Sequence, residues 1–167
     1  RHDGQAVTIE EFVLAMEEAS GRDLSQFRLW YKQSGTPEIE VESRYDNDNR
    51  ELTLTFYQHC PDTPNQTDKQ PFLIPVRLGF IDETGNAVEL NSNGESESTV
   101  EITERCQEAV FKGIDVNCVP SLLRNFSAPV KISYPYSMSQ LAHIMKHDSD
   151  GFNRWDAGQM LATKILL

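Results

Sequence analysis

Residues 39–58, IEVESRYDNDNRELTLTFYQ, decide the fold, because apolar and polar side chains alternate on both sides of the polar turn DNDN. A period of two residues predicts β-strands, and two such runs joined by a short polar turn predict a β-hairpin. We expect the core-facing side chains of the second strand to be Leu52, Leu54 and Phe56. Thr53 and Thr55 should lie on the opposite face, because successive side chains of a strand point to opposite faces.

The same period continues beyond the hairpin, in short runs separated by turn residues. We expect five further strands, at residues 72–82, 87–90, 98–104, 109–115 and 129–136. The third and fourth of these should pair with each other. Pro75, in the first, indicates a bulge or an edge position, because proline cannot donate to a sheet ladder. Seven short strands with frequent turns predict an antiparallel β-sandwich.

Residues before the hairpin follow a helical period instead. Thr8 and Glu11 form a capping-box pattern, and an apolar face follows at helical spacing, made of Ile9, Phe12, Val13 and Met16. A second, short helix is expected from Leu24 to about Gln33, with its apolar side chains at Phe27, Trp30 and Tyr31. Gly35 stands where a left-handed residue would end that helix, and Pro37 cannot continue it.

Two more helices are expected after the strands. They are SMSQLAHIMKHD (137–148) and FNRWDAGQMLATKILL (152–167), each with Ser, Asp or Asn as a candidate N-cap. Residues 1–33 and 137–167 are both too short to bury a core of their own. We therefore expect their apolar faces to pack on protein outside this chain, so that the chain alone self-associates or has loosely ordered ends.

The composition argues against several classes of partner. The 167 residues carry a formal net charge of −11, so nucleic acid and anionic membranes, which are also negative, are not expected partners. No apolar run approaches the roughly 18 residues that cross a bilayer, and residues 1–20 lack a signal-peptide pattern. The three cysteines, Cys60, Cys106 and Cys118, favour reduced thiols and a cytoplasmic location, with a single disulfide as the alternative.

One stretch, HIMKH, imitates a metal site. His143 and His147 have the spacing of metal ligands on a helix, but Ile144 stands where the general base of a zinc peptidase would be. No Glu follows Glu108 to supply a third ligand. We interpret the pair as helix-surface or interface histidines. The alternative is a metal site shared between two copies of the chain.

Three other features invite a functional interpretation. DNDNRE (46–51) lacks the glycine that a calcium loop needs at its sixth position, so we expect a polar hairpin turn. Trp30 and Trp155 are expected to be packing residues, with a ligand platform as the alternative. The acidic residues 95–97 are expected on a solvated loop, or else beside the entrance of a cavity that attracts peptide amino-termini.

Four stretches together resemble one family, the zinc-dependent alanyl aminopeptidases of the bacterial aminopeptidase N type. They are RHDGQAVTIEEFVLAMEEASGRDLSQFRLWYKQSGTP (1–37), KQPFLIPVRLGF (69–80), SAPVKISY (127–134) and FNRWDAGQMLAT (152–163). They are spread over nearly the whole chain, and the resemblance rests on all four together.

The resemblance implies that the chain is an internal segment of a longer enzyme. Residues 1–36 would be the last helices of a thermolysin-like catalytic domain, and residues 137–167 the first helices of a helical C-terminal domain. Residues 37–136 between them would be an immunoglobulin-like antiparallel β-sandwich, so the fold class is mainly β with short α-helical segments at both ends. SGTP (34–37) would be the hinge, and the QFRLWY helix (26–31) would pack on the missing catalytic domain.

The resemblance also implies an activity whose residues are not in this chain. The family releases amino-terminal residues from peptides with a zinc-activated water, using H-E-x-x-H, a further Glu and a G-A-M-E-N stretch. None of these motifs is present, so we assign no catalytic, cofactor-binding or metal residue and expect zinc only in the longer enzyme. The segment would be an inactive structural spacer. The alternative is a free-standing immunoglobulin-like module that binds a protein or a carbohydrate through its loops.

Overall fold

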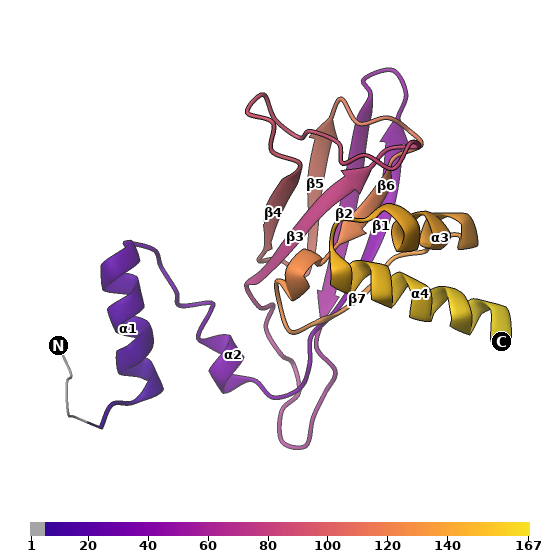
Figure 1. Cartoon of the computed structure of the whole chain (residues 1–167). Coiled ribbons are helices and arrows are strands. Elements are labelled where there is room, and N and C mark those ends of the chain that lie inside the picture. Colours follow the sequence, from indigo (N-terminus) through magenta and orange to yellow (C-terminus); the bar gives the residue numbers. More distant parts are fainter. Residues whose placement is uncertain (1–5) are drawn as a thin grey trace.

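A computed structural model describes residues 6–167 and shows two β-sheets with helices at both ends of the chain (Figure 1). The helices are α1 (Ile9–Ser20), α2 (Leu29–Lys32), α3 (Met138–His147), α4 (Gly151–Leu166) and a 3-10 turn, η1 (Arg124–Phe126). The strands are β1 (Glu38–Asp46), β2 (Glu51–His59), β3 (Ile74–Ile81), β4 (Glu97–Ile102), β5 (Cys106–Lys112), β6 (Val119–Leu122) and β7 (Lys131–Ser133). This confirms the predicted mainly β class. No helix within residues 6–167 is both long and apolar enough to cross a membrane.

The two sheets have the strand orders β5-β2-β1-β7 and β4-β3-β6. The predicted hairpin is confirmed, because β1 and β2 are antiparallel from the pair Glu38–His59 to the pair Asp46–Glu51. The sandwich is not wholly antiparallel, however, since β7 runs parallel to β1. The chain leaves β6 in one sheet and enters β7 in the other, so β7 arrives beside β1 by a crossover and not by a hairpin.

Two predictions about strand positions and pairing were wrong. Residues 87–90 contribute only an isolated bridge between Ala87 and Ile81, and the missing strand is β6 instead. All four residues of β6 are buried, so it lacks the alternation that identified the other strands. The strands expected at 98–104 and 109–115 correspond to β4 and β5, which pair with β3 and β2 in different sheets and not with each other.

Pro75 lies at a local edge, as predicted. At this residue β3 pairs only with β4, where Pro75 is opposite Glu101, because the pairing with β6 begins at Leu78. The missing amide of proline therefore removes no ladder hydrogen bond on the open side of β3.

The main core lies between the two sheets. Its largest fully buried side chains include Phe56, Phe72, Phe80, Ile39, Leu54, Ile74, Leu78, Ile102 and Ile114. The predicted inward-facing residues of β2 are all buried, and Thr53, predicted on the opposite face, is also only 6% exposed. β2 is an interior strand, and Thr53 lies between Arg44 of β1 and Val110 of β5.

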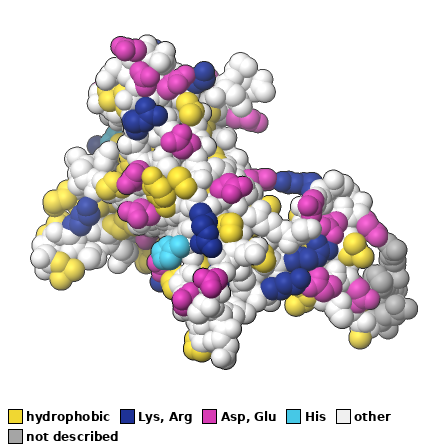
Figure 2. Space-filling view, turned by 180° about the vertical axis from the view of Figure 1, so that it is seen from behind, with side chains coloured by type: hydrophobic (Ala, Val, Ile, Leu, Met, Phe, Trp, Pro, Cys, Tyr) yellow, Lys and Arg dark blue, Asp and Glu magenta, His cyan; other side chains and the backbone are white. Residues whose placement is uncertain are grey.

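The first helix forms as predicted but finds little to pack on. The Thr8 side chain accepts from the Glu11 amide, and the Glu11 carboxylate accepts from the Thr8 amide at 2.7 Å, which completes the capping box. Of its apolar face only Val13 is buried, whereas Phe12 is 57% exposed. α1 stands apart from the sandwich, and charged side chains gather where it meets the rest of the molecule (Figures 1 and 2).

The second helix is shorter than predicted, because α2 makes a single turn and residues 25–28 before it form turns. Trp30 packs against residues of this chain. Its ring centroid lies 4.8 Å from that of Phe72, and its Nε1 donates to the Leu73 carbonyl at 2.9 Å. The prediction that this face packs on a missing domain is therefore wrong for Trp30, while Tyr31 remains exposed.

The linker 33–37 between α2 and β1 is held by the loop between β2 and β3, which argues against the predicted hinge. Lys69 is only 6% exposed, and its Nζ donates to the Ser34 carbonyl at 2.7 Å. The Gln66 side chain accepts from the Ser34 amide at 2.7 Å. Gly35 has a left-handed φ of 98°, as predicted, but it belongs to this linker and ends no helix. We call these contacts the Lys69 clamp.

Candidate functional site

The C-terminal helices are held on the sandwich by a second, smaller core. Ser137 opens α3 with a capping box and Asp150 caps α4, in agreement with the predicted cap types Ser, Asp or Asn. The buried side chains between helices and sandwich are Ile81, Val119, Tyr136, Leu141, Ile144 and Ala157. The Tyr136 hydroxyl donates to the Pro120 carbonyl at 2.8 Å, and burial raises the pKa of Tyr136 well above its usual value.

A buried ion pair joins helices and sandwich beside this core. Arg124 Nη1 donates to Asp148 Oδ1 at 2.7 Å, and the two side chains are 7% and 0% exposed. Ser121 Oγ donates to the other Asp148 oxygen at 2.5 Å. Arg124 Nε donates to Glu97 at 2.8 Å and Nη2 donates to Ser149 Oγ at 2.6 Å. A buried pair with such complete hydrogen bonding positions its elements strongly, because separating it would leave an uncompensated charge.

Asp150 also binds the turn of the sandwich that contains Arg124. One carboxylate oxygen accepts from the Asn153 amide at 2.9 Å and so caps α4, and the other accepts from the Asn125 amide at 2.7 Å. The turn contains three non-glycine residues with positive φ, namely Leu123, Asn125 and Phe126. Each such residue costs on the order of 1 kcal/mol, so the contact with α4 helps to hold a strained conformation.

His143 and His147 also belong to this junction. His143 Nε2 lies 2.7 Å from the Asp82 carbonyl oxygen, and the two imidazole centroids are 4.7 Å apart. A Cβ at Gly85 would overlap the His147 ring, so the turn after β3 packs directly against α3. Burial, with Lys146 and His143 nearby, lowers the pKa of His147. The interpretation of the pair as interface histidines agrees with this contact.

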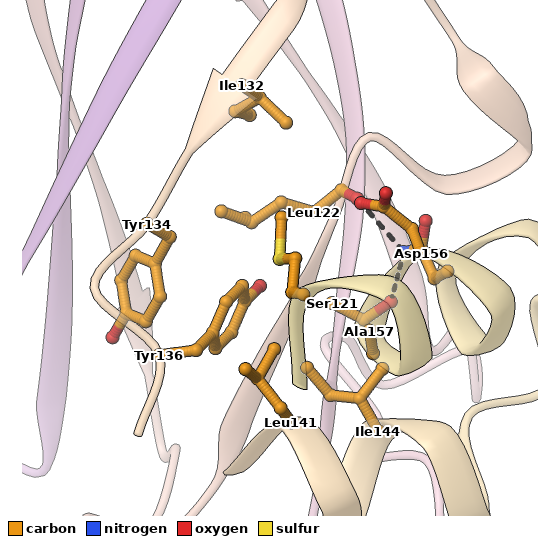
Figure 3. A pocket seen from close by; sticks show the side chains of 11 residues that line it. Ser121, Leu122, Ile132, Tyr134, Tyr136, Leu141, Ile144, Asp156 and Ala157 are labelled. Carbon is orange, nitrogen blue, oxygen red and sulfur yellow. Dashed lines mark hydrogen bonds between the residues drawn. The ribbon is translucent and has the colours of Figure 1, made fainter. Parts of the chain in front are cut away.

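A hollow of about 30 Å³ lies beside the ion pair, between β6, β7, α3 and α4 (Figure 3). Its apolar lining consists of Leu122, Ile132, Tyr134, Tyr136, Leu141, Ile144, Ala157 and Met160. Its polar lining is Ser121, Asn153 and Asp156. Asn153 Nδ2 donates to Ser121 Oγ at 2.8 Å and to the Leu122 carbonyl at 2.9 Å. Burial raises the pKa of Asp156.

Chemically, the junction positions the side chains of the elements that meet there. Within residues 6–167 there is no group of three or more His, Cys, Asp or Glu side chains placed to hold a metal ion. Cys60, Cys106 and Cys118 are free thiols, and burial raises the pKa of Cys118, which makes its thiolate less available.

Two of the other sequence-based candidates behave as expected. Asp46 Oδ1 accepts from the Asp48 amide at 2.9 Å, so DNDN is a hairpin turn closed by its own side chain. Trp30 is a packing residue.

One of the remaining candidates, Glu97, differs from expectation, and the other, Trp155, is left exposed. Glu97 of the acidic loop is not simply solvated, because it binds both Arg77 and Arg124. Trp155 is 59% exposed and contacts Phe152 at a ring distance of 6.0 Å, so it does not pack into the interior of this chain.

The residues that build the junction were largely missed by sequence reasoning. Asp150 was within reach as a cap candidate, but neither Arg124 nor Asp148 belongs to a motif. They are separated by 24 positions, and only the packing of α3 against β6 and of α4 against η1 brings them together.

Comparison with known families gives two matches that meet near the junction. A model described as a domain of unknown function, DUF3458, with an Ig-like fold matches residues 35–135. A second, DUF3458_C, described as ARM repeats, matches residues 138–167. The change of model thus falls between β7 and α3.

Individual relatives point in the same direction. The chain is similar to aminopeptidase N of Escherichia coli strain K12, with 45% identity over 100% of this chain and 19% of that protein. It is 44% identical to aminopeptidase N of Haemophilus influenzae, over 99% of this chain and 19% of that protein. Among solved structures, Legionella pneumophila aminopeptidase A in complex with aspartic acid matches with a TM-score of 0.82 and 30% identity, over 95% of this chain and 17% of that one. The chain thus spans about a fifth of the length of these relatives.

Proposed function

Since this chain belongs to the DUF3458 family and is homologous to aminopeptidase N over its whole length, we propose that it is a middle segment of a zinc aminopeptidase. The longer protein would release amino-terminal residues from peptides with a zinc-activated water. In this proposal residues 1–36 end the catalytic domain, residues 37–136 form the sandwich and residues 137–167 begin the helical domain. The segment itself would be a structural spacer without the zinc site.

The observation that carries the spacer role is the buried Arg124–Asp148 pair. A binding module would need only to keep its loops in place. This buried ion pair instead fixes the first two C-terminal helices to the sandwich. The Lys69 clamp fixes the linker at the other end of the sandwich. Both attachments favour a segment that sets the distance and angle between its neighbours.

The apolar surfaces left open support contacts with the rest of a longer protein. On α1 the residues concerned are Ile9, Phe12, Leu14 and Met16, and around α4 they are Phe126, Phe152, Trp155 and Ile165. A pair of helices from a repeat array cannot bury its apolar face alone, because each repeat packs on its neighbours. The match of α3 and α4 to ARM repeats therefore supports further helices as the cover for Trp155.

A reducing, cytoplasmic location is part of the proposal. The three cysteines are free, and structural disulfides are rare in that compartment.

The experiment is a peptidase assay on the purified chain loaded with zinc, using an amino-acyl chromogenic substrate. We expect no turnover above the rate with a chelator present. The variant His147→Ala is the matched control, because it removes one member of the histidine pair that resembles a metal site. Zinc-dependent turnover by the unmodified chain would contradict the proposal, and its loss in His147→Ala would favour the metal site at HIMKH.

The free-standing binding module has one observation in its favour. α3 and α4 pack on each other and on the sandwich, as a self-sufficient module would require. α1 does not follow this pattern, since its apolar face remains open.

A further inference from the structure

The hollow at the junction contains a carboxylate that the rest of the molecule leaves without a partner. Asp156 makes no hydrogen bond or ion pair with any residue in the range 6–167, and burial is the only influence on its ionisation. The other two polar residues of the lining are satisfied. Ser121 Oγ donates to Asp148 of the ion pair, and both hydrogens of the Asn153 side-chain amide are donated. Asp156 is thus the member of the lining that is free to receive a ligand.

The walls around Asp156 decide what kind of ligand fits. Ile132, Leu141 and Met160 provide apolar contact, and the rings of Tyr134 and Tyr136 lie 4.5 Å apart (Figure 3). A carboxylate beside aromatic rings attracts a cation, because both the charge and the ring faces are negative. The apolar walls favour a cation that is carried on a hydrocarbon stem.

We propose that this hollow binds a primary ammonium group on an apolar stem, with Asp156 as its counter-ion and Tyr134 and Tyr136 beside it. The size agrees, because about 30 Å³ accommodates one or two groups of the size of a water molecule, such as an ammonium and the carbon next to it. A divalent metal is a poor alternative, because a single carboxylate is too few protein ligands. The ammonium would come from a lysine side chain of adjoining protein or from a free alkylamine.

The binding experiment compares charged and neutral ligands of the same shape. The 167-residue chain is titrated with n-butylammonium chloride and with n-butanol at equal ionic strength, while the NMR resonances of Tyr136 and Leu141 are followed. We expect the ammonium to bind about tenfold more tightly than the alcohol, since only the cation can pair with Asp156. Equal affinities, or no shift with either ligand, would overturn the proposal.

Two variants and one pair of peptides complete the test. Asp156→Asn should bind the two ligands equally, whereas the control Asp115→Asn, at an exposed carboxylate elsewhere, should keep the preference. Retained preference in Asp156→Asn would contradict the role of Asp156. A peptide with blocked termini and a central lysine is then titrated, and the same peptide with norleucine in place of lysine is its control. Tighter binding of the lysine peptide than of n-butylammonium indicates a lysine side chain as the source of the ammonium. Tighter binding of n-butylammonium indicates a free amine.

A stability measurement tests the missing partner independently of any ligand. Because the folded state raises the pKa of Asp156, the ionised carboxylate opposes folding at neutral pH. Without ligand, Asp156→Asn should therefore raise the urea midpoint at pH 7, and the difference should shrink as the pH falls through the raised pKa. A lower midpoint for Asp156→Asn at pH 7 would show that Asp156 already has a stabilising partner and would overturn the proposal.

Discussion

Helix α1 is attached to the sandwich by other means than helices α3 and α4. At the C-terminal end, the charges of Arg124 and Asp148 are buried, and a small apolar core lies beside them. At the N-terminal end, the segment that follows α1 reaches the strands through a more exposed ion pair, Arg22–Glu101, and most of the apolar face of α1 stays exposed. The comparison teaches that α3 and α4 are parts of one packed body with the sandwich, whereas α1 is tethered to it.

The difference matters because burial changes how much the loss of one partner of an ion pair lowers the free energy of unfolding. Exposed ion pairs contribute about 0–1 kcal/mol, because water and salt screen them. Breaking a buried pair by removing one partner typically costs about 3–5 kcal/mol. Stability should therefore depend much more on the C-terminal junction than on the tether of α1.

The largest expected effect is that of Asp148→Ala. It leaves the Arg124 guanidinium buried without its counter-ion, so the free energy of unfolding should fall by about 3–5 kcal/mol in urea titrations. Lys131→Ala, which removes an exposed partner of Glu38, is the control and should change it by about 0–1 kcal/mol. Similar losses in the two variants would mean that the junction is no stronger than a surface pair. The double variant Arg124→Met/Asp148→Leu should recover much of the loss.

Lys69→Met tests the part of the N-terminal attachment that is buried. It removes the Nζ donor from the part-buried hydrogen bond to the Ser34 carbonyl, and such a bond contributes about 0.5–1.5 kcal/mol. Amide hydrogen exchange in residues 33–36 should accelerate more than in β2. The control is Lys112→Met, at an exposed side chain, which should leave exchange in the linker unchanged. Unchanged exchange in Lys69→Met would restore the interpretation of SGTP as a hinge.

Acid should loosen the attachment of α1 to the segment that follows it. The Arg28 guanidinium, which binds Glu17 at 2.6 Å, and the Leu24 amide lower the pKa of Glu17 to about 2. A carboxyl with a lowered folded pKa stabilises the fold above its unfolded pKa, so this contribution is complete above about pH 4.5 and is lost between about pH 4.5 and 2.

The chemical shifts of the α1 amides should follow that loss in an NMR titration. In Glu17→Gln, the α1 amides should have the chemical shifts of the loosened helix already at pH 7, and these shifts should change little on acidification. The control Asp82→Asn alters a carboxylate in a turn beside α3 and should leave the α1 titration intact. A Glu17 carboxyl that titrates near 4.5 would contradict the pairing with Arg28.

The smallest change in stability is expected from the open face of α1. Phe12→Gln and Met16→Gln replace exposed side chains, so the unfolding free energy should change by no more than about 0.5 kcal/mol. Self-association, measured by sedimentation velocity, should weaken because less apolar surface is exposed. Val13→Gln is the contrasting control, since Val13 is buried and its replacement should disturb α1 itself. A chain that is monomeric before mutation would contradict the expected self-association.

Local patterns were sufficient for much of the secondary structure. The hairpin of β1 and β2 follows from alternation around DNDN, and the starts of α1, α3 and α4 follow from Thr8, Ser137 and Asp150. These features depend on neighbours a few positions apart, so a linear sequence displays them. β6 was not predicted, because all of its residues are buried and its sequence therefore lacks the alternation of apolar and polar side chains.

The amino-acid order alone determined that strands form a sandwich between helical ends, since periodicity and capping act within a few residues. Which strands share a sheet, where Trp30 packs and why Arg124 meets Asp148 were settled only when distant segments came together. Burial is a property of the assembled molecule. The same lysine or aspartate is a weak surface charge in one place and, at Lys69 or Asp148, a group on which the arrangement of whole elements depends.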